Sequence, residues 1–241
     1  MNSKKVERLD KFLASQLNIS RKDAHRLIRE QMITVDEDIA TKSDQKIDPS
    51  SNSVKFDGKT VKYRKYIYIM MNKPEGFVSA SDGKGEPTVI DLLPPDLKRK
   101  KLFPAGRLDK NTTGFLLITD DGEFAHRLLS PKNNITKTYE AAIDIKITDD
   151  HINLFNKGIT LADGTKLKSA QLTPLAPLKD GQLVQIVISE GKFHQIKRMI
   201  NHIGGNVLML KRTKIGSVSL DKKLKLGQSR EMLHKELDDI L

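Results

Sequence analysis

Apolar residues recur at helical spacing near the start of the chain and predict two short helices followed by strands. The first helix has its apolar face at Val6, Leu9, Phe12, Leu13 and Leu17. Ser20, with Asp23 three residues later, is a typical N-cap with an acidic first turn, so a second helix begins there. Short strands are predicted at Met32–Val35 and Val54–Phe56. These elements predict a small first unit over residues 1–62.

The pattern changes after the polar stretch Lys62–Lys65, which predicts a linker. A strongly apolar strand, Tyr66–Met71, opens a second unit over residues 66–241. Further strands are predicted at 115–119, 135–143 and 207–211. Residues 159–189 predict two or three antiparallel strands, one of which is 183–188. Helices are predicted at 89–93, 123–129, 149–157 and from about 193 to 203. The C-terminal tail shows no motif.

Charge narrows the classes of partner. The chain has 42 Lys and Arg against 31 Asp and Glu, a net charge of +11, which favours nucleic acid or an anionic membrane surface. No apolar run is long enough to cross a bilayer, so the membrane reading loses its main support. The start, Met1–Lys5, is followed by no apolar stretch typical of a secretory signal. Cysteine is absent, which excludes disulfides and thiolate metal sites and fits a cytoplasmic protein.

The loop from Gly106 to Gly114 carries the first candidate chemistry. It holds a cation, Arg107, and a carboxylate, Asp109, directly before the short apolar run Phe115–Thr119. A charged loop against a buried strand is a common place for functional residues. Taken alone, an Arg and an Asp this close more often form a surface ion pair.

The complete sequence of the loop favours a functional role for these two residues over a surface ion pair. Gly-Arg-Leu-Asp-x-x-Thr-x-Gly, followed by an apolar strand and Thr-Asp-Asp-Gly, resembles the signature of RsuA-type ribosomal RNA pseudouridine synthases. The resemblance implies that Asp109 is the catalytic residue and that Arg107 lies against the RNA where the target base leaves the helix. Lys-Thr-Tyr at 137–139 matches the segment whose tyrosine stacks on that base, which implies this role for Tyr139. Otherwise Tyr139 is an ordinary half-buried strand aromatic.

A third run, Glu190–Met199, resembles the family segment Glu-Gly-x-x-His-Gln-hydrophobic-basic-Arg-Met. The resemblance implies that Ile196 packs against the active site and that Lys197 pairs with the catalytic Asp. Many relatives outside this branch carry Arg at the latter position, and Lys lacks the two-pronged geometry of Arg. The roles of Lys197 and Arg198 could therefore be exchanged, and both are candidate substrate-binding residues. A lone His on such a helix is more often structural, so His194 is given no role.

The first unit resembles the small RNA-binding module first known from ribosomal protein S-four. The resemblance covers nearly all of residues 5–62, beginning with Arg-Leu-Asp-Lys-Phe-Leu at 8–13. It implies a helical surface that recognises the shape and phosphates of folded RNA. The candidate RNA-docking residues are Arg8, Arg21, Lys22, Arg26 and Arg29. The alternative is a solvated helix face, but residues 1–65 carry 15 Lys and Arg against only 10 Asp and Glu.

The implied reaction requires no cofactor. Uridine and pseudouridine are isomers, so no redox group, nucleotide or metal is consumed, and the sequence shows no phosphate-binding loop, dinucleotide fingerprint or zinc spacing. We therefore expect neither a cofactor nor a metal. Asp120 and Asp121 could hold Mg²⁺, but a turn that caps the following helix is the better interpretation.

The sequence thus predicts an α+β protein. A small RNA-binding module precedes a catalytic domain with a mixed, largely antiparallel central sheet flanked by helices. The predicted function is isomerisation of a uridine in ribosomal RNA, most simply 16S rRNA of the small subunit. The alternatives are a 23S rRNA target, a non-catalytic ribosome assembly factor, and a metal-dependent nuclease. The expected partner is ribosomal RNA or a pre-ribosomal particle, and the expected state is a cytoplasmic monomer away from membranes.

Overall fold

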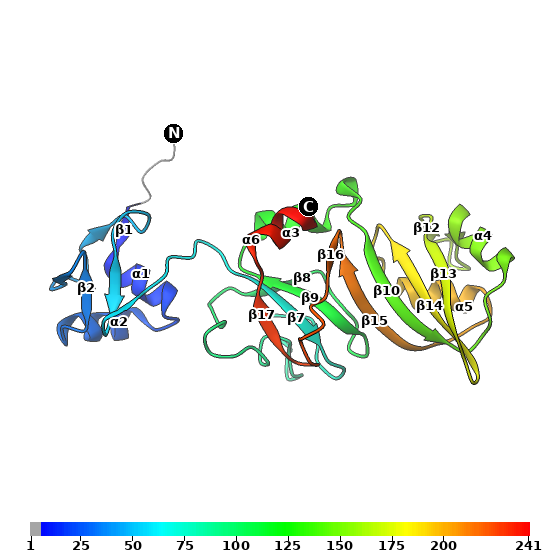
Figure 1. The fold of residues 1–241 in the computed structure, drawn as a ribbon, viewed down its shortest axis with the longest axis horizontal. Helices are drawn as coiled ribbons and strands as arrows, with labels where there is room; N and C mark the ends of the chain where they lie inside the picture. The colour runs from blue at the N-terminus through cyan, green and yellow to red at the C-terminus, as the bar shows by residue number, and fades with distance from the viewer. Residues whose placement is uncertain (1–5) are drawn as a thin grey trace. The chain divides into compact units, whose positions relative to one another are not determined.

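The computed structural model describes residues 6–241, which form two compact units (Figure 1). The first unit runs to Ile67 and includes Lys98–Lys101. The second consists of Tyr68–Leu97 and Leu102–Leu241. The expectation about Met1–Lys5 lies outside the described residues. Within residues 6–241, no helix has the length and apolar character needed to span a bilayer.

The first unit packs two helices against small sheets. Helices α1 (Leu9–Gln16) and α2 (Arg21–Arg29) bury Phe12, Leu13 and Ile28 in a common core. The predicted N-cap is confirmed, because the Ser20 hydroxyl accepts a hydrogen bond from the Asp23 amide. A four-stranded sheet has the order β3-β2-β5-β6, and β1 pairs with β4. The bounds are β1 Glu7–Arg8, β2 Ile33–Val35, β3 Asp38–Ile39, β4 Lys46–Ile47, β5 Val54–Phe56 and β6 Lys59–Thr60.

The second unit is built on one nine-stranded sheet, which confirms the predicted mixed, largely antiparallel architecture. Its strand order is β13-β14-β10-β15-β9-β7-β17, with β8 paired to β9 and β16 paired to β15. Only the β9–β15 pairing is parallel. The bounds are β7 Tyr68–Lys73, β8 Phe103–Ala105, β9 Thr113–Thr119, β10 Lys137–Ile143, β13 Gln171–Leu178, β14 Gly181–Ile188, β15 Val207–Ile215, β16 Val218–Ser219 and β17 Ser229–Glu231. A separate ribbon pairs β11 (Ile159–Thr160) with β12 (Lys166–Leu167).

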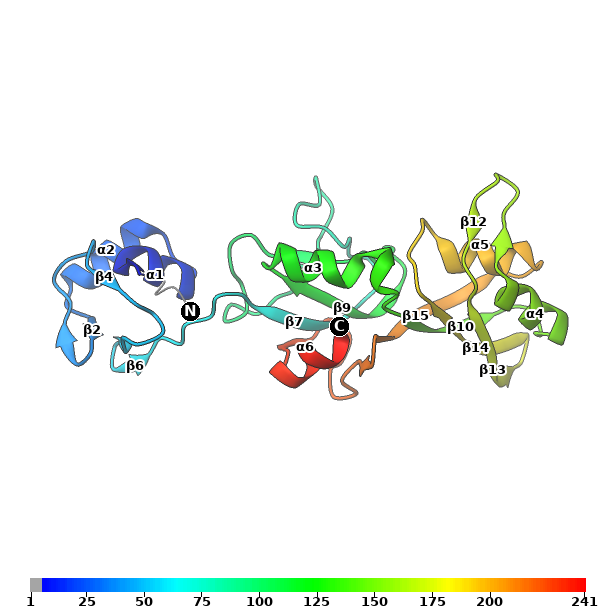
Figure 2. The same cartoon turned by 90° about the horizontal axis from the view of Figure 1, so that it is seen from above.

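Helices cover the two ends of this sheet (Figure 2). Helices α3 (Gly122–Leu129) and α6 (His234–Ile240) contribute Phe124, Leu128 and Ile240 to the core around β7 and β9. Helix α4 (Asp149–Lys157) packs on β13, and α5 (Gln195–His202) packs on β15. A short 3₁₀ helix, η1, covers Pro131–Asn133.

Three sequence expectations differ from the structure. The predicted helix at 89–93 is a series of turns, because the Asp91 carboxylate bonds locally to the amide and hydroxyl of Thr88. The predicted strand Tyr66–Met71 is β7, which instead spans Tyr68–Lys73 and is an interior strand paired with β9 and β17. The tail without a motif supplies both β17 and α6, since its residues pair with β7 and bury Ile240.

A glycine permits the close contact where β9 meets β15. The parallel pairing joins only Thr113 with Lys211 and Gly114 with Arg212. Gly114 has a φ of 101°, and a Cβ there would lie 2.2 Å from the Arg212 carbonyl oxygen. Only glycine fits this backbone conformation and this spacing. The loop that ends at Gly114 is thereby fixed directly against β15.

Replacing this glycine is expected to destabilise the second unit. Gly114→Ala should lower the free energy of unfolding by at least about 2 kcal/mol, because the strands must separate and the backbone is strained. Gly122→Ala is the matched control, because a Cβ at that helix position meets no atom within 4 Å. Urea unfolding measures both. Equal stability of the two variants would contradict this account of the strand junction.

Candidate active site

The loop before β9 is held in place by a buried lysine. Lys73, at the end of β7, is fully buried, and its ammonium donates hydrogen bonds of 3.0–3.2 Å to the carbonyls of Pro74, Asp109, Lys110 and Thr112. Burial lowers the pKa of Lys73 to about 8, while the charges of Asp109 and Glu75 act in the opposite direction. A single cation therefore satisfies several loop carbonyls and fixes the backbone of Asp109.

A second anchor acts one residue earlier. The Ser79 hydroxyl, which is buried, donates to the Leu108 carbonyl at 2.9 Å and accepts from the Leu108 amide at 3.1 Å. The loop also closes on itself, since the Thr112 amide donates to the Asp109 carbonyl at 3.0 Å. The backbone on both sides of the Asp109 side chain is therefore fixed by hydrogen bonds.

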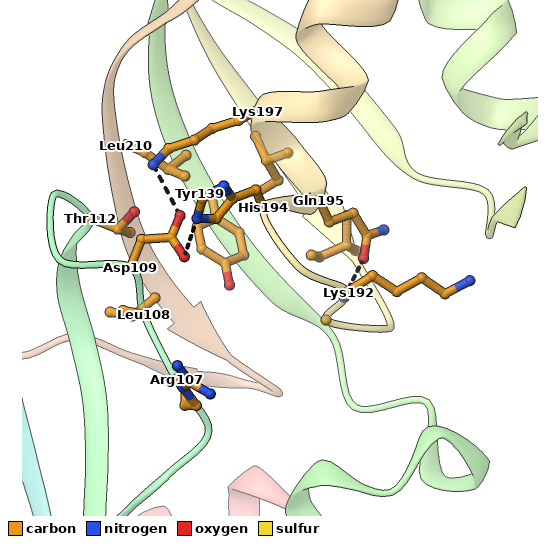
Figure 3. A pocket seen from close by; sticks show the side chains of 13 residues that line it. Arg107, Leu108, Asp109, Thr112, Tyr139, Lys192, His194, Gln195, Lys197 and Leu210 are labelled. Carbon is orange, nitrogen blue, oxygen red and sulfur yellow. Dashed lines mark hydrogen bonds and ion pairs between the residues drawn. The ribbon is translucent and has the colours of Figure 1, made fainter. Parts of the chain in front are cut away.

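The Asp109 carboxylate points into a pocket, toward helix α5 (Figure 3). Lys197 Nζ lies 3.0 Å from Asp109 Oδ2 and also donates to Asn111 Oδ1 at 2.7 Å. His194 Nε2 lies 3.6 Å from Asp109 Oδ1, beyond hydrogen-bond length. The Asp109 side chain keeps 30% of its surface exposed, so the carboxylate is paired and still accessible.

The pocket brings together most of the predicted site residues. Its lining comprises Arg107, Leu108, Asp109, Thr112, Tyr139, Ile188, Gly191, Lys192, His194, Gln195, Ile196, Lys197 and Leu210. Arg107 lies on the same loop as Asp109, apart from the carboxylate, and Tyr139 reaches the pocket from β10 (Figure 3). One acid, the phenol ring of Tyr139 and several cations thus surround one cavity, which suits a nucleotide with its planar base and anionic phosphate.

Arg198 is the predicted site residue that is absent from this lining. Its guanidinium pairs with the Asp163 carboxylate and contacts Thr165, in the turn between β11 and β12. Consecutive helix residues point about 100° apart, since a turn takes 3.6 residues. Lys197 therefore faces Asp109, and Arg198 faces another part of the unit.

The structure shows a further residue behind the pocket that the sequence analysis missed. Arg212 on β15 is 4% exposed and donates to the Phe115 carbonyl at 2.7 Å. Its Nη1 lies 3.4 Å from the Tyr139 hydroxyl, and its guanidinium lies 5.9 Å from the ring centroid. Arg212 thus supports Tyr139 from within the sheet. Arg212 lies on a charged strand outside the three segments that resemble the family, so the sequence did not indicate a role for it.

In the first unit, the candidate docking residues gather around a buried carboxylate. Asp10 is 1% exposed and bonds to Arg8, Arg21 and His25 at 2.8–3.1 Å. Burial would raise the pKa of Asp10, but the hydrogen bonds from Arg8, His25 and Arg21 outweigh it and hold the pKa well below its ordinary value. The sequence analysis missed the parts that Asp10 and His25 play in this cluster.

The other predicted docking residues, Lys22, Arg26 and Arg29, lie with Arg21 on helix α2. Lys22 lines a shallow pocket with Arg8, Asp10, Arg21 and His25. Arg26 and Arg29 are both exposed, and the Arg26 guanidinium lies 3.6 Å from the Asp23 carboxylate. The exposed face of α2 is therefore basic, with a fixed cationic cluster at its start.

The Asp120–Gly122 turn has the helix-capping role that the sequence favoured. Asp121 Oδ1 accepts the amides of Glu123 and Phe124 at 3.0 Å, and Oδ2 accepts the Tyr68 hydroxyl at 2.7 Å. Both carboxylate oxygens of Asp121 are therefore occupied, one by the N-terminal amides of α3 and the other by Tyr68. Across residues 6–241, no group of three His, Asp or Glu side chains is arranged to hold a metal ion.

Comparison with known proteins agrees with this geometry. The RNA pseudouridylate synthase model matches residues 67–202, and the S4 domain model matches residues 7–52. An uncharacterized RNA pseudouridine synthase of Bacillus subtilis, YtzG, is 41% identical over 95% of this chain and 96% of its own length. A crystal structure of a pseudouridylate synthase shares 33% identity and a TM-score of 0.67, covering 98% of this chain and 100% of that chain.

Two further relatives share one printed name. The proteins named ribosomal small subunit pseudouridine synthase A from Salmonella typhimurium and Escherichia coli are 39% and 38% identical over 97% of this chain. The matched regions cover 99% and 100% of those proteins. The fold and pocket thus define an RNA-modifying isomerase with an S4 domain. The chain belongs to the RNA pseudouridylate synthase family, and the resemblance seen in the sequence is confirmed.

Removing the buried loop anchor is expected to impair catalysis more than folding. Lys73→Met should lower the rate of isomerisation by at least about 100-fold, because the Asp109 backbone loses its fixed position. Lys225→Met is the matched control, since Lys225 is exposed in a loop. Pseudouridine formation and thermal unfolding are measured on both variants. A folded Lys73→Met protein with full activity would refute the anchoring role.

The Asp10 cluster predicts a pH-dependent stability difference. Because the folded pKa of Asp10 lies below its ordinary value, the unfolded chain holds this proton more tightly. The stabilisation is complete above about pH 5 and is lost as the pH falls through the folded pKa. The free energy of unfolding of the wild type should exceed that of Asp10→Asn by at least about 1 kcal/mol at pH 7, and by less below pH 4. Urea unfolding followed by α1 and α2 amide signals measures this; a pH-independent difference would contradict it.

Proposed function

We propose that this chain converts a uridine of small-subunit ribosomal RNA to pseudouridine, with the ionised carboxylate of Asp109 as the catalytic group. The observation that carries the proposal is the shared pocket, in which the Asp109 carboxylate contacts Lys197 and Tyr139 supplies an aromatic ring. The printed names of the Salmonella and Escherichia coli relatives support the small subunit as the source of the substrate.

The reaction needs one ionised carboxylate near the ribose and the base. The bond between the sugar C1′ and the base N1 breaks, the uracil turns, and C5 bonds to C1′. The C5 proton is released to solvent and N1 takes up a proton, so the product is an isomer of the substrate. Asp109 is suited to act as the nucleophile or base. The Lys197 ammonium at 3.0 Å balances its charge and fixes its orientation, while the exposed part of the carboxylate remains open to substrate.

The target base must leave its stack before it can reach Asp109. Extruding a base costs a few kcal/mol, and stacking on an aromatic ring contributes about 1–3 kcal/mol. Tyr139, supported by Arg212, is suited to receive the base, and Ile196 closes the pocket beside it. Arg107, which is exposed at the pocket, is suited to hold a phosphate or the vacated position.

The first unit is proposed to dock the enzyme on folded RNA. Residues 1–62 would form the docking domain and residues 66–241 the catalytic domain. Arg8, Arg21, Lys22, Arg26 and Arg29 would contact phosphates, so affinity should depend on the salt concentration. The proposed partner is ribosomal RNA or a pre-ribosomal particle, and the enzyme would act as a cytoplasmic monomer. Arg198, paired with Asp163, is not included among the proposed substrate contacts.

Tritium release tests the proposed reaction. A small-subunit rRNA transcript labelled at uracil C5 should release tritium with the wild type and no added metal. Asp109→Asn should lower the rate at least about 1,000-fold, because an amide cannot act as nucleophile or base. Asp180→Asn, at an exposed turn between β13 and β14, should behave as wild type.

The same assay separates the rival functions. A nuclease would shorten the transcript and would require a metal ion. A non-catalytic assembly factor would bind the transcript without releasing tritium. Undiminished release by Asp109→Asn would show that another group performs the reaction. Release from a large-subunit transcript alone would leave the reaction in place and change the proposed substrate.

A further inference from the structure

One aromatic ring of this protein is left largely in solvent. Phe193 is 76% exposed, the highest value among the exposed large hydrophobic residues of the described chain. Every other Phe and Tyr in residues 6–241 is buried or half-buried. A single exposed apolar side chain is common on protein surfaces. Phe193 differs from such isolated residues because it lies beside the active-site pocket, next to His194.

The Phe193 ring stacks on a residue that lines the pocket. The ring centroids of Phe193 and His194 lie 3.8 Å apart, with an angle of 20° between the planes. His194 lines the pocket, and its Nε2 lies 3.6 Å from Asp109 Oδ1. The two rings form a continuous stack, which we call the Phe193–His194 pair, from the catalytic carboxylate to the pocket edge.

The turn that carries this pair is held rigidly. His194 has a φ of 48°, a left-handed conformation that few residues other than glycine adopt. Gln195 is buried and fixes the turn, since it accepts from the Lys192 amide at 3.0 Å and donates to Glu190 at 3.0 Å. The fold thus maintains a strained residue and an exposed ring at the same place, as functional sites often do.

The surroundings favour a nucleotide as the occupant. Lys192, Arg107 and Lys197 line the pocket together with His194, on which the Phe193 ring stacks, and these cations attract phosphates. An aromatic ring beside a cationic groove is the usual arrangement for binding bases of an unpaired strand. The bases on either side of an extruded uridine lose one stacking partner each, and an exposed ring at the pocket edge can replace it.

We propose that the Phe193–His194 pair is a stacking platform for the base next to the target uridine. This inference rests on the proposed function and adds a positioning subsite to it. Tyr139 receives the extruded base inside the pocket, while Phe193 holds its neighbour outside. The platform thereby anchors the strand beside the pocket. Because the platform binds ground state and transition state alike, it lowers KM and leaves kcat nearly unchanged.

A tryptophan reporter tests the contact directly. The chain contains no Trp, so Phe193→Trp introduces a unique fluorophore at the platform. Titration with a small-subunit rRNA transcript should quench its emission saturably as a base stacks on the indole. Leu226→Trp, at a loop position that is 60% exposed, is the control and should show no saturable quenching. Binding of the transcript without quenching at position 193 would overturn the proposal, as would equal quenching at both positions.

Kinetics separate a stacking role from a structural one. Phe193→Ala and Phe193→Leu should raise KM about 10-fold or more, as expected from loss of one stacked base, with kcat within about two-fold of wild type. Phe193→Tyr should restore KM, because stacking requires a ring. Equal KM values for all four proteins, or a loss confined to kcat, would refute the platform. Absence of tritium release by the wild type would instead refute the proposed function, while the fluorescence titration would still report base contact.

Discussion

The ion pair between Asp109 and Lys197 is the interaction on which the arrangement of the active site depends. It joins a loop before β9 to the first turn of α5, two segments 88 residues apart in the chain. The same pair leaves part of the carboxylate exposed to the pocket. A charge that was fully buried would need further partners to offset its lost hydration. Here one cation orients the carboxylate and the open side remains available for substrate.

Two features of the sheet hold the partners of this pair at the required distance. Gly114 permits the close parallel contact of β9 with β15. Strand β15 also pairs with β10, which carries Tyr139, so the loop and Tyr139 are held by the same sheet. Lys73 then satisfies loop carbonyls that would otherwise be buried without donors. The loop conformation thus depends on groups from distant parts of the chain.

Local patterns predicted much of the fold because they act over a few residues. The cap at Ser20, the cap at Asp121 and the helix over 149–157 follow from side chains next to the backbone groups they satisfy. The tail was unpredictable for the opposite reason. Its strand pairs with β7 and its helix packs into the core beside it, and these long-range contacts leave no local sequence motif.

The candidate site was predictable where a long motif existed. Asp109, Tyr139, Ile196 and Lys197 share the pocket, while Arg198 follows the helical rotation away from it. The anchoring role of Lys73 could not be predicted, because most of the carbonyls that bind its ammonium come from the distant loop at Asp109, Lys110 and Thr112. The roles of Asp10 and Arg212 could not be predicted for a similar reason, because their hydrogen-bond partners come from other elements.

The most direct test is to map pseudouridine in ribosomal RNA from cells that lack this chain. The account predicts that one small-subunit position loses its pseudouridine, that the wild-type chain restores it, and that Asp109→Asn, expressed at the same level, does not. Retention of every pseudouridine in the deletion, or restoration by Asp109→Asn, would contradict the central claim that this carboxylate performs the isomerisation.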